Sequence, residues 1–164
     1  MNLASEGIIT NIRDFSESDK LVTILTKDYG VIETIAKSAR KSTSRKSSKI
    51  ELLNKCKILF TKSKSIPILL ELELVDNIDF NKNPDLINYI FYFCELLSKT
   101  FSKGLEIEEV YDKISEIRTI LPEYKFISII LVQLMILNFQ GALPDLKSCV
   151  ICSKDLTEER FLNG

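Results

Sequence analysis

Apolar and polar residues alternate with a period of two in five stretches of the first 75 residues of the chain. This period predicts strands, because successive side chains of a strand point to opposite faces of a sheet. The five predicted strands are Glu6–Arg13, Lys20–Thr26, Val31–Ala36, Glu51–Thr61 and Ile68–Val75. Five short strands indicate a small closed barrel. An SH3-like barrel also has five strands, so the count leaves the type of barrel open.

Beyond these strands, apolar residues recur every three or four positions in three stretches, which predicts three helices. The first begins at the Asn-Pro-Asp run of residues 83–85, a good N-cap followed by a proline at the first helical position, and ends near Gly104. The second runs from Ile107 to Leu121. Pro122 opens the third, which closes at Gly141. The third stretch is almost entirely apolar, so we expect it to form the core of the helices.

These patterns predict an α+β chain in two parts, a five-stranded β-barrel at residues 1–80 and an α-helical domain at residues 81–164. The apolar fraction of 45% and charged fraction of 27% are ordinary for a globular protein. The longest apolar-rich run, Phe126–Phe139, is too short and too polar to cross a bilayer, and the first residues do not resemble a secretory signal. We therefore expect a cytoplasmic protein without a membrane partner.

Positive charge is concentrated between the third and fourth predicted strands, in residues 37–49, which we call the basic segment. It contains no acidic residue, and its six cations are Lys37, Arg40, Lys41, Arg45, Lys46 and Lys49. The other residues are Ser, Thr and Ala, so nothing bulky and apolar is expected to anchor it in a core. The segment is either a phosphate-binding loop or a solvated linker. Because the whole chain has a net charge of −1, the basic character is local.

Cys149 and Cys152 form a CxxC pair, which is half of a tetrahedral zinc site. A redox pair and two incidental thiols are the alternatives. Cys56 and Cys94 lie on apolar faces and are expected in the core. The chain has no histidine, which excludes within it a Ser-His-Asp triad, a Cys-His pair and any histidine-ligated metal.

Two further groups of residues between the predicted strands have both a functional and a structural interpretation. The acidic cluster of Asp14, Glu17 and Asp19 is either a metal or acid–base site or a set of solvated turn carboxylates. Phe15 and Tyr29 are placed either to stack on bases or to pack at the rim of the barrel.

The run from Glu6 to Ser47 resembles the start of the RecO family of bacterial DNA-repair proteins. The likeness lies in Gly7-Ile8-Ile9, Arg13-Asp14-Phe15, Tyr29-Gly30-Val31-Ile32 and the Ala39-Arg40-Lys41 corner. A second match, Leu143–Cys152, is similar to the family's run into its zinc knuckle. Ser38 stands where the family usually has a glycine.

The resemblance implies an OB barrel followed by a helical domain that carries the zinc knuckle. RecO proteins are recombination mediators and not enzymes. They bind single- and double-stranded DNA, anneal complementary strands, engage the C-terminal tail of the single-stranded-DNA-binding protein, and help load the recombinase together with RecR. DNA contact is carried over to Lys37, Arg40, Lys41, Arg45 and Lys46, and Lys49 completes the set of expected phosphate contacts.

The resemblance places metal ligation on Cys149 and Cys152. Family members are generally longer and have a second cysteine pair, so we expect this chain to be truncated within the knuckle. Zinc is then expected only if a longer chain supplies the missing ligands.

Two alternatives to a DNA mediator remain from the residues themselves. An RNA-binding OB protein would use the same basic segment, whereas a protein–peptide adaptor would bind through its helices and leave the segment idle. From the resemblance, an acidic, apolar-ended peptide is expected to bind the helical part, whose cations are Lys99, Lys103, Lys113, Arg118, Lys125 and Lys147.

Overall fold

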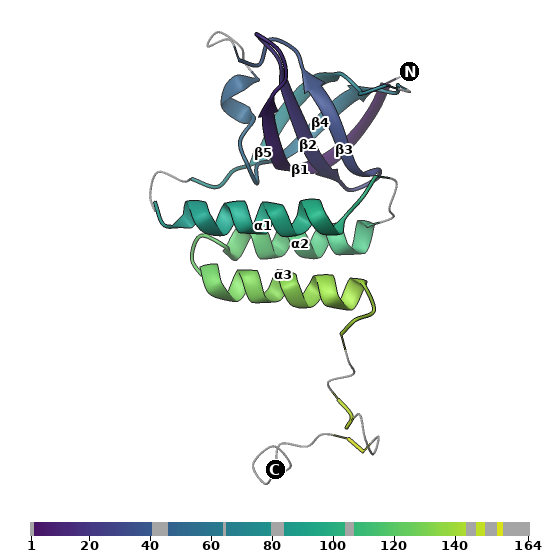
Figure 1. The fold of residues 1–164 in the computed structure, drawn as a ribbon, viewed down its shortest axis with the longest axis vertical. Coiled ribbons are helices and arrows are strands. Elements are labelled where there is room, and N and C mark those ends of the chain that lie inside the picture. The colour runs from purple at the N-terminus through teal and green to yellow at the C-terminus, as the bar shows by residue number, and fades with distance from the viewer. Residues whose placement is uncertain are drawn as a thin grey trace.

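Within the residues that the structure describes, five strands come first and three α-helices follow (Figure 1). The structure is a computed structural model, and it describes residues 2–40, 46–63, 65–79, 84–103, 107–143, 147–149 and 154–155. The strands are β1 (Asn2–Asp14), β2 (Lys20–Thr26), β3 (Gly30–Ala36), β4 (Lys55–Thr61) and β5 (Leu69–Asp76). The helices are α1 (Leu86–Thr100), α2 (Glu108–Ile120) and α3 (Lys125–Phe139), and a single 3-10 turn, Ser47–Lys49, precedes β4.

The five strands form one sheet in the order β3-β2-β1-β4-β5, with all neighbouring strands antiparallel. The two outer strands then meet. Ile35 of β3 bridges in parallel to Ile68, and its N–H donates to the Pro67 carbonyl at 2.8 Å. A five-stranded barrel closed in this way between its third and fifth strands is of the OB type. The expected fold class, an OB-type barrel followed by helices, is confirmed.

β1 is long because it pairs with two partners in turn. Its first half pairs with β4, its second half pairs with β2, and the register shifts between Ile9 and Asn11. Gly7 lies where the two pairings overlap. A Cβ added at Gly7 would clash with Cγ2 of Ile24, so the barrel wall closes here only around a glycine.

The fourth strand begins at Lys55, and the expected start at Glu51 is wrong. Residues 51–54 turn instead, because Leu53 has a left-handed φ of 60° and its N–H donates to the Ile9 carbonyl at 2.8 Å. Leu52 packs against the core on the side of the helices, while Cys56 lies inside the barrel.

The helices cover one end of the barrel and share a core with it. In Figure 1, α1 and α2 lie next to the barrel and α3 lies farthest from it. One hydrophobic cluster joins Ile8, Leu25 and Leu53 of the barrel part to Phe93 of α1 and Tyr111 of α2. The barrel is therefore closed at this end by side chains of α1 and α2.

The expectation that the third helix forms the core of the helices is wrong. α3 packs on α1 and α2 with only one side, and six of its large apolar side chains remain exposed, with Phe126 reaching 69%. They are Phe126, Ile127, Ile130, Leu131, Leu134 and Leu137. Pro122 lies in the turn before α3, which starts at Lys125, and Gly141 ends the helix with a φ of +68°. No helix in the described part of the chain has the length and apolar character needed to span a membrane.

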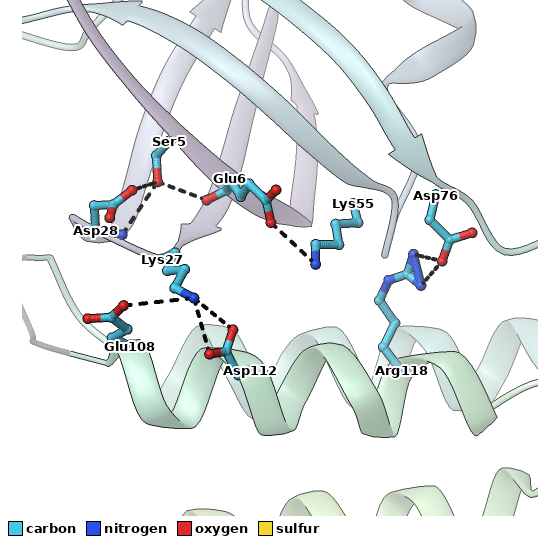
Figure 2. Close-up of polar contacts among 9 residues, drawn as sticks. All are labelled: Ser5, Glu6, Lys27, Asp28, Lys55, Asp76, Glu108, Asp112 and Arg118. Atoms are coloured by element: carbon cyan, nitrogen blue, oxygen red, sulfur yellow. Dashed lines mark hydrogen bonds and ion pairs between the residues drawn. The ribbon is translucent and has the colours of Figure 1, made fainter.

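Ion pairs join α2 to the barrel part of the chain (Figure 2). Lys27 follows β2, and its Nζ lies 3.1 Å from both carboxylate oxygens of Asp112. At the other end of α2, Nη1 and Nη2 of Arg118 donate to Oδ2 of Asp76 at 2.9 and 2.7 Å. The Arg118 side chain is 1% exposed and that of Asp76 is 50% exposed, so the guanidinium is enclosed and its carboxylate partner reaches solvent.

Candidate nucleic-acid interface

The basic segment leaves β3 through a corner that Asp19 fixes. The carboxylate of Asp19 accepts hydrogen bonds from the backbone N–H of Ser38 at 2.8 Å and from Nζ of Lys37 at 3.0 Å. The N–H of Arg40 donates to the Ser18 carbonyl at 2.9 Å. Asp19 is buried, and these hydrogen bonds, led by that of Ser38, lower its pKa to about 2. The β1–β2 connection therefore holds the start of the segment in one conformation.

Acid should release this corner. Because the folded-state pKa of Asp19 is about 2, below the ordinary value near ~3.9, its contribution to stability is present above about pH 4 and disappears as the pH falls toward 2. We expect Asp19→Asn to be less stable than the parent at pH 7, and the difference to shrink between pH 4 and pH 2. Thermal melts over this range measure it, with Glu17→Gln, an exposed carboxylate of the same connection, as the control. Parallel pH profiles for parent and Asp19→Asn would contradict the role given to Asp19.

Ser38 has a φ of 56°, in the left-handed region that favours glycine. This explains structurally why glycine suits the position in the family that the sequence resembles. We expect Ser38→Gly to raise the free energy of unfolding by about 0.5–1 kcal/mol, because the strain on the Cβ disappears while the N–H still donates to Asp19.

A matched control for Ser38→Gly is Ser48→Gly, in the 3-10 turn, where φ is negative. At this position glycine only increases the conformational entropy of the unfolded chain. It should lower stability. Urea unfolding of both variants tests the pair, and a loss of stability in Ser38→Gly would show that the corner does not strain serine.

Lys37 and Arg40 remain exposed while they make their contacts. Arg40 donates to the Ser16 carbonyl at 2.8 Å and pairs with Asp14 at 3.3 Å. Both cations therefore contact the β1–β2 connection, and part of each side chain is exposed to solvent. The pair of Arg40 with Asp14 is exposed on both sides, and such pairs are weak and can exchange a carboxylate for a phosphate, whereas the partner of Lys37, Asp19, is buried.

Lys46 points inward, in contrast to Lys37 and Arg40. Its Nζ donates to the carbonyls of Leu69 and Leu70 at 3.0 and 2.5 Å, at the start of β5. Loss of water around this amine lowers its pKa from the ordinary value. Ala39 is also fully buried in the barrel core, so this small side chain and the hydrogen bonds of Lys46 anchor the segment without any bulky apolar residue.

The remaining cations of the segment are only partly described. Lys49 is half-exposed at the end of the 3-10 turn, and its carbonyl accepts a hydrogen bond from Nδ2 of Asn54 at 3.0 Å. Lys41 and Arg45 lie outside the described residues. The structure thus brings Lys37 and Arg40 together at one corner. Lys46 lies at the start of β5.

The acidic cluster is divided among structural contacts. Asp14 pairs with Arg40 and Asp19 with Lys37, while Glu17 is exposed. No group of three potential metal ligands occurs among the residues that the structure describes. Asp19, expected in a solvated turn or a metal site, is a buried hydrogen-bond acceptor.

The cysteines of the barrel and of α1 are core residues, as expected. Cys56 and Cys94 are buried, and burial raises their thiol pKa values to about 11 and about 12. Such thiols are unreactive at neutral pH. Cys149 lies beside a short antiparallel bridge between Ser148 and Asp155, and its N–H donates to the Lys154 carbonyl at 2.8 Å. Cys152 lies outside the described residues.

The two cysteines of the CxxC pair supply two of the four ligands that a structural zinc site requires. The donor set of this chain is therefore half of a site, and no function is assigned through a metal.

Both parts of the chain match known families. The model described as "Recombination protein O N terminal" matches residues 1–78, and the model described as "Recombination protein O C terminal" matches residues 82–164. The chain belongs to the RecO family. The likeness noted in the sequence is confirmed, and the OB-type barrel and the helices correspond to the two RecO family models.

Several curated RecO proteins are similar along almost the whole chain. A protein of Moorella thermoacetica named "DNA repair protein RecO" is 28% identical over 161 residues, which are 93% of this chain and 58% of that protein. Relatives of the same name from Bacillus pumilus and Clostridium acetobutylicum are 29% and 25% identical, and the matches cover 61% and 66% of those proteins. This chain therefore spans about three fifths of the length of these RecO relatives.

Proposed function

We infer that this chain is a recombination mediator that binds single- and double-stranded DNA and anneals complementary strands. The observation that supports this best is the fixed corner at the end of β3, where Asp19 holds the basic segment and leaves Lys37 and Arg40 exposed. Related proteins are named for DNA repair, which fits the same activity. Annealing needs no covalent chemistry, only positive charge that offsets the repulsion between phosphates.

In this proposal, phosphates contact Lys37, Arg40, Lys41, Arg45 and Lys49. Lys46 was also expected to contact DNA, but its bonds to the Leu69 and Leu70 carbonyls favour a role in holding the segment on the barrel. Contacts to phosphates give affinity with little sequence preference. This suits a protein that must act wherever single strands occur.

Strand annealing tests the proposal. Two complementary oligonucleotides with a fluorescent donor and acceptor should anneal faster in the presence of the protein, and the gain should fall as salt rises. An RNA pair of the same sequence separates the mediator from an RNA-binding OB protein, which would favour RNA. Absence of both acceleration and binding at low salt would overturn the proposal and favour the peptide adaptor.

We further propose that the C-terminal tail of the single-stranded-DNA-binding protein binds between the barrel and α1. A groove of about 500 Å³ lies there, with Ile12, Leu52 and Phe91 among its lining and Lys99 at its edge. Phe91 is 55% exposed, and Lys99 pairs with Glu95 at 2.6 Å. An apolar end would contact Phe91, and the acidic residues would contact Lys99. Arg118, expected among the cations for this peptide, is buried and paired with Asp76.

We expect Phe91→Ala to weaken binding of this tail at least tenfold, because an exposed aromatic in a groove is a typical anchor for a peptide. Fluorescence anisotropy of a labelled tail peptide measures it. Phe126→Ala, which removes the most exposed aromatic of α3, is the matched control and should leave affinity unchanged. Equal effects of the two variants would remove the groove as the site. Help in loading the recombinase together with RecR completes the proposed function and is assigned to no residue.

A further inference from the structure

A second groove lies on the barrel and shares no lining residue with the groove at Phe91. It has a volume of about 440 Å³ and forms where the β2–β3 turn, the β4–β5 connection and the residues after α1 meet. Its apolar lining includes Leu3, Ile32, Phe60 and Pro67. Tyr29 and two lysines complete it, and we call it the Tyr29 groove. The sequence separates these segments by up to about a hundred residues, and only the closed barrel brings them together.

The backbone around the groove is fixed by hydrogen bonds. Oγ1 of Thr26 donates to the Gly30 carbonyl at 2.7 Å and accepts from the Tyr29 N–H at 3.1 Å. Gly30 bridges to Lys103 in antiparallel fashion, which places the chain after α1 against the edge of β3. The opposite wall is held by the bond from Ile35 to Pro67. A ligand would therefore enter a preformed site.

Tyr29 supplies an aromatic ring at this site. The ring is half-exposed and packs against Phe60 edge to face, with centroids 5.6 Å apart and an interplanar angle of 87°. A tyrosine ring held in this way loses little freedom when a flat partner stacks on it. Nucleobases are such partners, and base stacking on aromatic side chains is tolerant of sequence.

The rim carries charges of both signs. Asp28 and Glu33 line the groove; Glu33 pairs with Arg13 at 2.7 Å, and Asp28 accepts a hydrogen bond from the neutral hydroxyl of Ser5 and keeps its charge. Lys62 and Lys103 are exposed, and neither makes an ion pair with any residue that the structure describes. Two amines in the lining of the Tyr29 groove are thus open to phosphates.

We propose that the Tyr29 groove holds one unstacked base of a single strand against Tyr29, with the flanking phosphates on Lys62 and Lys103. This proposal rests on the proposed DNA-binding function, and it implies that the groove selects single-stranded over double-stranded DNA. A duplex keeps its bases stacked and paired and offers none to the groove. The groove and the basic corner lie at opposite ends of β3, whose seven residues span roughly 20 Å. One strand along β3 reaches both, within the roughly 4–16 nucleotides that an OB barrel covers.

The test compares Tyr29→Leu with Tyr29→Phe and with Phe15→Leu, the other exposed aromatic between strands. Tyr29→Leu should weaken binding of an oligothymidine about tenfold and leave duplex affinity unchanged, since only the stacked base is lost. Tyr29→Phe keeps a ring and should bind as the parent does, and so should Phe15→Leu. The chain has no tryptophan and five tyrosines, so quenching of tyrosine fluorescence by the oligomer reports stacking directly. That quenching should decrease in Tyr29→Phe.

The rim is tested by Lys62→Ala/Lys103→Ala, with Lys113→Ala/Lys125→Ala as the charge-matched control. The rim variant should flatten the plot of log affinity against log salt by about 1.4 for a single strand, at ~0.7 per contact, and the control should not. If the parent binds DNA but both the Tyr29→Leu and the rim variants bind as the parent does, the groove proposal fails and the proposed function stands. If the parent binds no DNA, both fail. If Tyr29→Leu weakens only the acidic peptide, the groove is a peptide site and the proposal is overturned.

Discussion

Asp76→Ala is expected to lower the free energy of unfolding by about 3–5 kcal/mol, the largest stability effect that we predict for a single residue. The reason is the enclosed Arg118, whose side chain is 1% exposed and whose Nε has no hydrogen-bond partner among the described residues. Burial lowers the pKa of Arg118 and Asp76 opposes that shift. Without Asp76 a buried positive charge would have no counter-ion. Such a loss is a large part of the stability of a small protein.

Two further variants make this prediction specific. Adding Arg118→Met to Asp76→Ala removes the buried charge and keeps most of the side-chain volume, so the double variant should recover much of the lost stability. Asp112→Ala breaks the neighbouring pair with Lys27, both partners of which reach solvent, and should cost about 1 kcal/mol or less. Urea unfolding measures all three. Equal costs for Asp76→Ala and Asp112→Ala would show that Arg118 does not depend on its carboxylate.

Lys41→Ala/Arg45→Ala is expected to produce the largest loss of DNA affinity. If Lys37, Arg40, Lys41, Arg45 and Lys49 each neutralise one phosphate of a single strand, log affinity should fall against log salt with a slope of about −3.5, from ~0.7 per contact. Removing two contacts should bring the slope to about −2.1. Arg45 can bind two phosphate oxygens at once, so Arg45→Ala should cost more affinity than Lys41→Ala. Binding to an oligothymidine across a salt series gives each slope.

The control for this experiment is Lys113→Ala/Lys125→Ala on the helices, which changes net charge equally. It should shift affinity slightly and leave the slope unchanged. Lys46→Ala forms a separate comparison: we expect a lower melting temperature because two carbonyls at the start of β5 lose their donor. An unchanged slope in Lys41→Ala/Arg45→Ala would show that the basic segment is a solvated linker.

Local periodicity predicted the elements well because each one buries a single face. The alternation of apolar residues located β2, β3 and β5 to within one residue, and the spacing of three to four located all three helices; the start of β1 was placed four residues too late. Burial of Cys56 and Cys94 followed from their positions on apolar faces. The predicted start of β4 was wrong because the pattern of apolar residues does not indicate that Leu53 adopts a left-handed conformation.

The candidate interface was predicted only in part. The sequence placed six cations in one segment, because the charge of each side chain follows directly from the residue type. It did not indicate that Asp19 would be buried beneath the segment, or that Lys46 would turn inward to the Leu69 and Leu70 carbonyls. Those contacts join residues about twenty positions apart whose partners depend on how β1, β2, β3 and β5 are arranged.

The sequence by itself determined the order of strands and helices, the place of the positive charge and the membership of the RecO family. Each of these is recorded in neighbouring residues or in the likeness of whole segments. Only the tertiary structure decided that β3 closes on β5, that α3 lies outside and not in the core, that Arg118 is enclosed beside Asp76, and that Tyr29, Lys62 and Lys103 line one groove. The physical reason is that each of these features depends on which faces meet across the barrel. A hydrophobic pattern indicates that a face is buried, but it does not indicate which surface covers that face.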